Sequence, residues 1–84
     1  MSYQIALSRT AEKDLARLSQ DAYEAVVERL RAMKENPRPH GVRKLQGREG
    51  YRSRVGDYRI LYVVVDAAQI VTVLAIGHRR DVYR

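Results

Sequence analysis

The chain has 84 residues, which suits a single domain over residues 1–84, and its 16 Lys and Arg against 10 Asp and Glu give a net charge of +6. Cysteine is absent, which excludes disulfides, thiolate metal sites and a cysteine nucleophile. The longest apolar run, residues 60–65, is far shorter than a membrane span, and no signal-peptide segment is present, so we expect a soluble cytoplasmic protein without membrane contact.

The N-terminal half predicts one short strand and two helices. Apolar residues alternate at positions 3, 5 and 7, which indicates the strand, and Ser8 to Thr10 supply helix-start chemistry. Apolar residues at 11, 15, 18 and 22 fit a first helical stripe, and those at 23, 26, 27, 30 and 33 fit a second. The second helix must end near Asn36, because a residue that precedes proline avoids the α conformation.

From residue 42 onward the pattern changes to β. A short strand is expected over 42–45, a hairpin over 51–55 and 58–65, and a last strand over 70–76. The last strand is rich in β-branched residues and apolar on both faces, which predicts a central, covered position. The order is therefore β-α-α-β-β-β-β. We expect an α+β fold with the two N-terminal helices packed on a mainly antiparallel sheet of four to five strands.

The hairpin carries arginines where a purely structural hairpin would not favour them. A two-residue turn at positions 56 and 57 sets Arg54 opposite Arg59, and Arg52 lies on the same face because side chains alternate. Like charges directly opposite each other destabilise a strand pair, so the arrangement indicates a bound anion. In a small basic protein, nucleic-acid phosphate fits that role. The alternatives are solvated strand residues and, for Arg59, a structural ion pair with an aspartate.

Basic residues are concentrated in the C-terminal part of the chain. Residues 1–37 carry six basic and six acidic side chains, a net of zero, whereas residues 38–84 carry ten and four, a net of +6. Nine of those ten cations are arginine, whose planar guanidinium suits bidentate phosphate contact. Solubility alone does not explain this segregation, so the pattern favours an anionic partner.

The last strand should return beside the start of the hairpin's second strand, so the segment His78–Tyr83 is expected to converge with the arginines. Cleavage of RNA by its own 2′-hydroxyl needs a base, an acid and cations around the phosphate, but no metal or other cofactor. Histidine is the side-chain type suited to proton transfer near neutral pH, which makes His78 the candidate base, and Tyr83 can transfer a proton or stack on a nucleic-acid base. The structural alternatives are that His78 is a hydrogen-bonded histidine at the end of a strand and that Tyr83 packs the C-terminal segment onto the sheet. The predicted catalytic residues are Arg52, Arg54, Arg59, His78, Arg79 and Tyr83, and the further phosphate-binding residues are Arg43, Lys44, Arg48 and Arg80.

Three motifs resemble the RelE toxins of the RelE/ParE superfamily: K-L-x-G over 44–47, Y-x-x-R-V-G-D-Y-R-x-x-Y over 51–62 and I-G-H-R-R-D-V-Y over 76–83. The resemblance covers essentially the whole chain. It implies a microbial RNase-like fold and a toxin that cuts mRNA in the ribosomal A site, without metal, by 2′-hydroxyl attack. It also implies a RelB-like antitoxin, the ribosome and mRNA as partners. Operator DNA is expected to bind the toxin–antitoxin complex through the antitoxin.

One feature departs from the best-known RelE pattern, which has lysines where this chain has Arg52 and Arg54. Arginine keeps its proton, so the role of base moves toward His78. Two alternative functions share the fold: a ParE-like inhibitor of DNA gyrase, and an inactive domain that binds only its antitoxin. The arginines together with His78 and Tyr83 favour the RNase, since a gyrase inhibitor does not need them.

Overall fold

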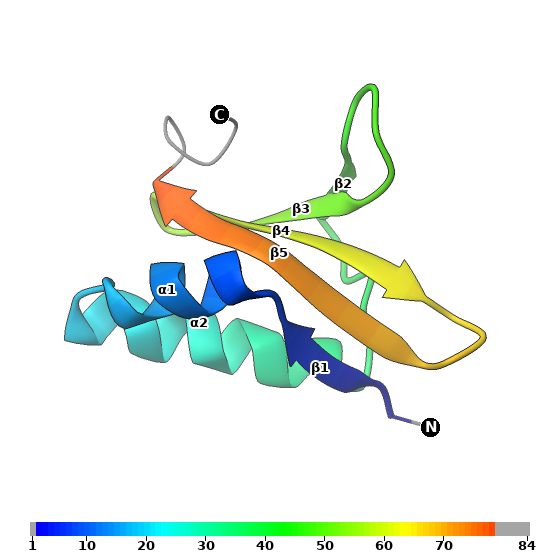
Figure 1. The fold of residues 1–84 in the computed structure, drawn as a ribbon, viewed down its shortest axis with the longest axis horizontal. Coiled ribbons are helices and arrows are strands. Elements are labelled where there is room, and N and C mark those ends of the chain that lie inside the picture. The colour runs from blue at the N-terminus through cyan, green and yellow to red at the C-terminus, as the bar shows by residue number, and fades with distance from the viewer. Residues whose placement is uncertain (1, 79–84) are drawn as a thin grey trace.

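The computed structural model of this chain describes residues 2–78 as two helices and a five-stranded sheet. Figure 1 shows both helices on one side of the sheet and the β2–β3 loop rising from the other side. The predicted α+β class and the predicted element order are confirmed. In chain order the elements are β1 (Gln4–Leu7), α1 (Arg9–Ala16), α2 (Gln20–Met33), β2 (Arg43–Lys44), β3 (Tyr51–Val55), β4 (Tyr58–Val65) and β5 (Ile70–His78).

The sheet has the order β1-β5-β4-β3-β2. Only β1 is parallel to its neighbour, β5, and the other three pairings are antiparallel, so the sheet is mainly antiparallel as predicted. β5 is an interior strand, but the prediction that both of its faces are covered is wrong for residues 2–78. The helices bury Val71, Val73 and Ile76 on one face, whereas Ile70 and Thr72 on the other face remain half-buried.

Each helix begins at a serine that the sequence supplies. The Oγ atoms of Ser8 and Ser19 accept hydrogen bonds from the backbone N–H groups of Ala11 and Ala22, at 3.0 and 3.3 Å. These side chains satisfy N–H groups that have no partner inside the helix. α2 ends at Met33, which is consistent with the predicted end before the Asn36–Pro37 bond.

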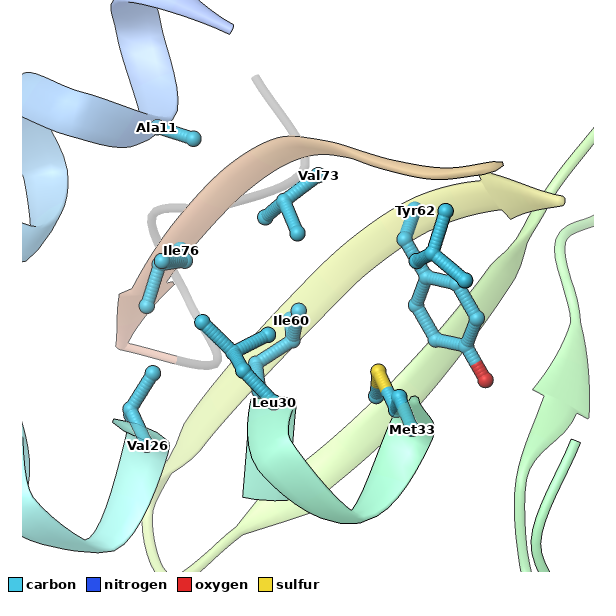
Figure 2. Packing of buried hydrophobic residues seen from close by; sticks show 9 residues of the cluster. Ala11, Val26, Leu30, Met33, Ile60, Tyr62, Val73 and Ile76 are labelled. Carbon is cyan, nitrogen blue, oxygen red and sulfur yellow. The ribbon is translucent and has the colours of Figure 1, made fainter. Parts of the chain in front are cut away.

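The core lies between α1, α2 and the helix-side face of the sheet. Figure 2 shows Val26, Leu30 and Met33 of α2 pointing toward the sheet, where Ile60, Tyr62 and Ile76 lie. Tyr62 is fully buried, and its hydroxyl donates a hydrogen bond to the carbonyl of Pro37 at 2.7 Å. This burial raises the pKa of Tyr62 to about 12. Tyr23, assigned to the same stripe from sequence, is 42% exposed, which corrects that assignment. Its amphipathic ring suits a partly wet position.

An irregularity on β5 is held in place by α1. The register between β4 and β5 shifts between Leu61 and Tyr62, which leaves Leu74 as the extra residue of a bulge. The Oγ of Ser8 donates to the carbonyl of Leu74 at 2.9 Å, and the N–H of Ile76 donates to Oδ2 of Asp14 at 2.9 Å. These bonds satisfy backbone groups around the bulge.

Candidate nucleic-acid interface

Four arginines from three strands share the sheet face opposite the helices. Arg54 lies opposite Arg59, as predicted, and Arg43 lies opposite Arg52, so two like-charge cross-strand pairs stand on this face. The neighbouring Ser53 is buried on the helix side, and alternation therefore directs Arg52 and Arg54 away from it. These four arginines and Gly41 line a cavity of about 290 Å³, which we name the arginine hollow.

The β3–β4 turn fixes the first of these pairs. Gly56 has a φ of +58°, which glycine adopts without strain, and the two-residue turn sets Val55 opposite Tyr58. Arg54 and Arg59 are then forced to face each other one residue further along. The turn thus imposes a cation pair that costs the sheet stability.

Burial differs among the arginines. Arg54 is exposed, Arg52 and Arg59 are half-buried, and the Nε atom of Arg59 is buried. Leu61, the cross-strand partner of Arg52, is only 1% exposed and gives this face an apolar floor. Charges beside apolar surface are screened less than charges in open water. An anion in the hollow would therefore experience a strong field.

Arg29 of α2 binds to β3 from the helix side of the sheet, on the face opposite the arginine hollow. One of its guanidinium nitrogens donates to Oγ of Ser53 at 2.6 Å and to the backbone carbonyl of Arg54 at 3.0 Å. Sequence reasoning missed this residue. The available signal was its spacing, three residues after Val26 and four before Met33, which places Arg29 on the inward stripe of α2.

His78 lies at the same end of the sheet as Arg59 but on the other face. The predicted return of β5 is confirmed, because His78 pairs with Tyr58 and Gly77 pairs with Arg59. The His78 and Tyr58 rings touch edge-on, with centroids 5.9 Å apart. Since paired residues share a face, His78 belongs to the helix side. The structure therefore brings His78 next to the arginines at one end of the sheet, as expected, but places it on the opposite face. Arg79, Arg80 and Tyr83 lie outside the described residues.

The three other predicted cations that the structure describes gather around β2. Arg43 and Lys44 form this short strand, and Arg48 belongs to the β2–β3 loop. Together with Arg52 they line a second cavity of about 720 Å³, which we name the β2 cavity. Because Arg43 and Arg52 line both cavities, the β2 cavity adjoins the arginine hollow.

Arg38, which belongs to the basic segment 38–84, has a structural role instead. Arg38 pairs with Asp66 at 2.7 Å, donates through Nε to the Tyr51 hydroxyl at 2.9 Å and stacks 5.3 Å from the centre of that ring. The Tyr3 hydroxyl also donates to Asp66, at 2.7 Å. The hydrogen bond from Arg38 and then that from Tyr3 lower the pKa of Asp66. This cluster, which we name the Arg38 clamp, fastens the connector before β2 to the far end of β4.

The residues that the structure describes contain neither a metal-binding cluster of side chains nor a helix that could span a membrane. Within residues 2–78, no group of three or more His, Asp and Glu side chains is arranged to hold a metal ion. No helix in that range has the length and hydropathy needed to cross a membrane. The charge of the arginine hollow comes from guanidinium groups.

Known proteins resemble this chain over nearly its full length. Residues 5–83 match the family model described as ParE toxin of type II toxin–antitoxin system, parDE. Toxin RelG of Mycobacterium tuberculosis is 34% identical over 88 aligned positions that cover 100% of this chain and 99% of the relative. Toxin RelE of the same organism is 34% identical, with 98% and 87% covered.

Solved structures agree with these sequence matches. The RelBE2 toxin–antitoxin complex of M. tuberculosis contains a chain with a TM-score of 0.83 and 28% identity, covering 94% of this chain and 100% of the relative. The archaeal RelE–RelB complex of Pyrococcus horikoshii gives 0.83 and 28%, with 96% and 99% covered. The YoeB/ParE toxin of Agrobacterium tumefaciens, at 17% identity and a TM-score of 0.79 with 90% and 98% covered, shares the fold.

Proposed function

The chain belongs to the RelE/ParE superfamily of toxins from type II toxin–antitoxin systems, and from that premise we propose that it is an endoribonuclease that cuts mRNA in the ribosomal A site. The observation that carries the proposal is the arginine hollow, where four guanidinium groups face one cavity across two repulsive strand pairs. An RNA phosphate placed there would offset that repulsion. It would also gain stabilisation as its charge grows in the transition state.

The reaction uses the RNA's own 2′-hydroxyl. Its oxygen attacks the adjacent phosphorus and its proton passes to a base, while the bond from phosphorus to the 5′-oxygen breaks and that oxygen takes a proton from an acid. The products are a 2′,3′-cyclic phosphate and a 5′-hydroxyl. Arg52, Arg54 and Arg59 bind the phosphate and keep their protons. Arg79 is proposed as a further phosphate contact.

The two proton transfers are assigned to His78 and Tyr83. His78 ends β5 beside the hollow but on the helix side of the sheet, so the RNA must pass around the end of β4 and β5 to meet it. Neutral imidazole accepts a proton near physiological pH, which an arginine does not do. Tyr83 is proposed to steer or donate a proton and to stack on a base.

A RelB-like antitoxin is the proposed partner. Chains similar to this one were solved as RelE–RelB complexes. An acidic or amphipathic antitoxin segment would neutralise the basic face and exclude RNA from it. The complex is proposed to bind operator DNA through the antitoxin. Co-expression with the neighbouring reading frame should restore growth, and growth arrest that persists would contradict this partner.

Inhibition of DNA gyrase is the second candidate, because the matching family model is described as ParE toxin. The discriminating experiment is primer extension on mRNA in a translating extract. The wild-type chain is compared with Arg54→Ala and with Arg31→Ala, which removes an exposed arginine on α2. The nuclease predicts cuts within codons for the wild type and Arg31→Ala, and far fewer for Arg54→Ala. Intact mRNA together with DNA breaks in cells would identify the gyrase inhibitor.

A further inference from the structure

The β2 cavity is large enough to hold more than a phosphate. Its volume of about 720 Å³ lies within the roughly 300–1,000 Å³ of typical small-molecule sites. It lies beside the arginine hollow, since Arg43 and Arg52 line both. An RNA strand whose phosphate occupies the hollow would therefore continue into this cavity.

The lining of the β2 cavity differs chemically from that of the hollow. The hollow is lined by arginines and one glycine, which suits a phosphate alone. The β2 cavity adds the apolar side chains of Val42, Leu45 and Leu61, and the amide of Gln46, and no acidic residue is among its described lining residues. Apolar walls accept the face of a base, and an amide can both donate to and accept from a base edge. Lys44 and Arg48 at the same cavity can meet the next phosphate.

The loop that forms one wall is fastened to the sheet. The N–H of Leu45 donates to the carbonyl of Gly50 at 3.0 Å, which closes the loop at its base. Gly50 packs so close to β4 that a Cβ there would lie 2.8 Å from the carbonyl oxygen of Tyr62 and 3.2 Å from Cδ1 of Leu45. The wall is therefore held against the strand at its base. A preorganised wall costs less ordering when a ligand binds.

We propose that the β2 cavity holds the nucleotide next to the phosphate bound in the arginine hollow, and that Gln46 reads the edge of its base. This inference rests on the proposed nuclease function. The ligand is single-stranded RNA, because a base in a duplex has its face and its pairing edge already occupied. Phosphate contacts from Lys44 and Arg48 position the strand, whereas Gln46 supplies sequence preference.

The test compares cleavage preferences in a translating extract. A set of mRNAs differs at each nucleotide flanking one cut site, and primer extension measures the cutting of each by the wild type, Gln46→Ala and Lys44→Ala. Gln4→Ala, which removes an exposed glutamine on β1, is the matched control. We expect Gln46→Ala to reduce the preference at one flanking position about five-fold or more, since a good base contact discriminates by that order. Lys44→Ala should lower cutting of all sequences alike.

The outcomes separate this inference from the function on which it rests. A wild-type protein that cuts no mRNA overturns both. Cutting by the wild type with identical preferences for Gln46→Ala overturns the inference alone. Antitoxin binding is measured in parallel by titrating the antitoxin against cleavage. If Gln46→Ala weakens that inhibition while preferences stay unchanged, the cavity is a peptide site and the inference is wrong.

Discussion

The arginines that line the hollow destabilise the sheet, and the same side chains are the ones proposed to bind the ligand. Each directly opposed like-charge pair costs on the order of 0.2–1 kcal/mol, and this sheet contains two of them on one face. Arg29 offsets part of that cost from the helix side through its bonds to Ser53 and to the Arg54 carbonyl. A cluster of like charges that lowers the stability of the fold is expected at a site where a ligand of opposite charge binds.

Replacing Arg54 by threonine should therefore stabilise the protein while it impairs the proposed activity. The change removes the repulsion with Arg59 and introduces a residue that favours strands. We expect the free energy of unfolding to rise by about 0.2–1 kcal/mol, measured by urea denaturation. Arg54→Lys retains the repulsive charge and is the matched control, with stability near that of the wild type. Loss of stability in Arg54→Thr would show that Arg54 supports the fold instead.

His78→Ala and Tyr83→Phe should lower the cleavage rate more than ribosome affinity. General acid–base catalysis contributes about 10²–10⁴-fold, so each change should cause a large loss in single-turnover cleavage. His40→Ala, which alters the other histidine, exposed in the connector, should cut normally. Tyr83→Phe keeps the ring, so full activity there with loss in Tyr83→Ala would assign the ring to stacking. If His78→Ala and Tyr83→Ala both remain fully active, the catalytic assignment is wrong.

Sequence reasoning identified the arginines but not all of their surroundings. The two-residue turn fixes Arg54 opposite Arg59 by local register alone, and this prediction is confirmed. Arg43 opposite Arg52 depends on where β2 joins the sheet, across a loop whose sequence sets no register. Strand parity could have placed His78 on the helix side, because it falls two residues after the buried Ile76. The predicted strand ended at residue 76, however, so this alternation could be applied to His78 only once β5 was observed to extend that far.

At the scale of elements, the short strand β2 builds both cavities although it has only two residues. Two fastenings hold it in place. On one side the Arg38 clamp ties the connector to the end of β4, and on the other side Gly50 lets the β2–β3 loop approach β4. Neither could be predicted from the sequence pattern, because each joins residues that are distant in the chain and carry no periodicity.

Gly50→Ala should disrupt the β2–β3 loop. Its φ of +126° disfavours a side chain, and the new Cβ would lie 2.8 Å from a backbone oxygen of β4. We expect a loss of about 1–3 kcal/mol in the free energy of unfolding, together with weaker RNA binding. Gly47→Ala is the comparison, since its φ is +74° but nothing lies within 4 Å of the added Cβ. Equal losses in the two variants would mean that the approach to β4 is unimportant.

The Arg38 clamp should add a pH-dependent contribution to stability. The pKa of Asp66 is lower in the folded protein than its ordinary value because Arg38 and Tyr3 hydrogen-bond to the carboxylate. Stability from this group is therefore present above about pH 4 and is lost as the pH falls through the folded pKa. Urea midpoints between pH 2 and 7 should show a smaller acid decline for Asp66→Asn than for the wild type. Glu35→Gln, which removes an exposed carboxylate, should leave the decline unchanged.

At the scale of the whole molecule, charge is separated by sheet face. The helices come from the neutral first part of the chain, while the four arginines of β2, β3 and β4 that line the arginine hollow occupy the opposite face. The fold was predictable because helix caps, hairpin turn and apolar periodicity are local signals that agree with one another. The pairing of β1 beside β5 was not, since it joins the two ends of the sequence. One cation of the basic segment, Arg38, belongs to a structural ion pair instead.

This separation predicts a steep salt dependence of RNA binding. Each arginine that engages a phosphate releases counterions, so the logarithm of the association constant should fall linearly with the logarithm of salt concentration. Arg54→Ala should reduce the slope by about one unit at most, because it removes one phosphate contact. Arg31→Ala, on the exposed surface of α2, removes the same charge from the helix side and should leave the slope unchanged. Fluorescence anisotropy of a single-stranded oligoribonucleotide titrated at several salt concentrations measures both slopes. Equal reductions in the two variants would mean that net charge, and not the arginine hollow, attracts the RNA.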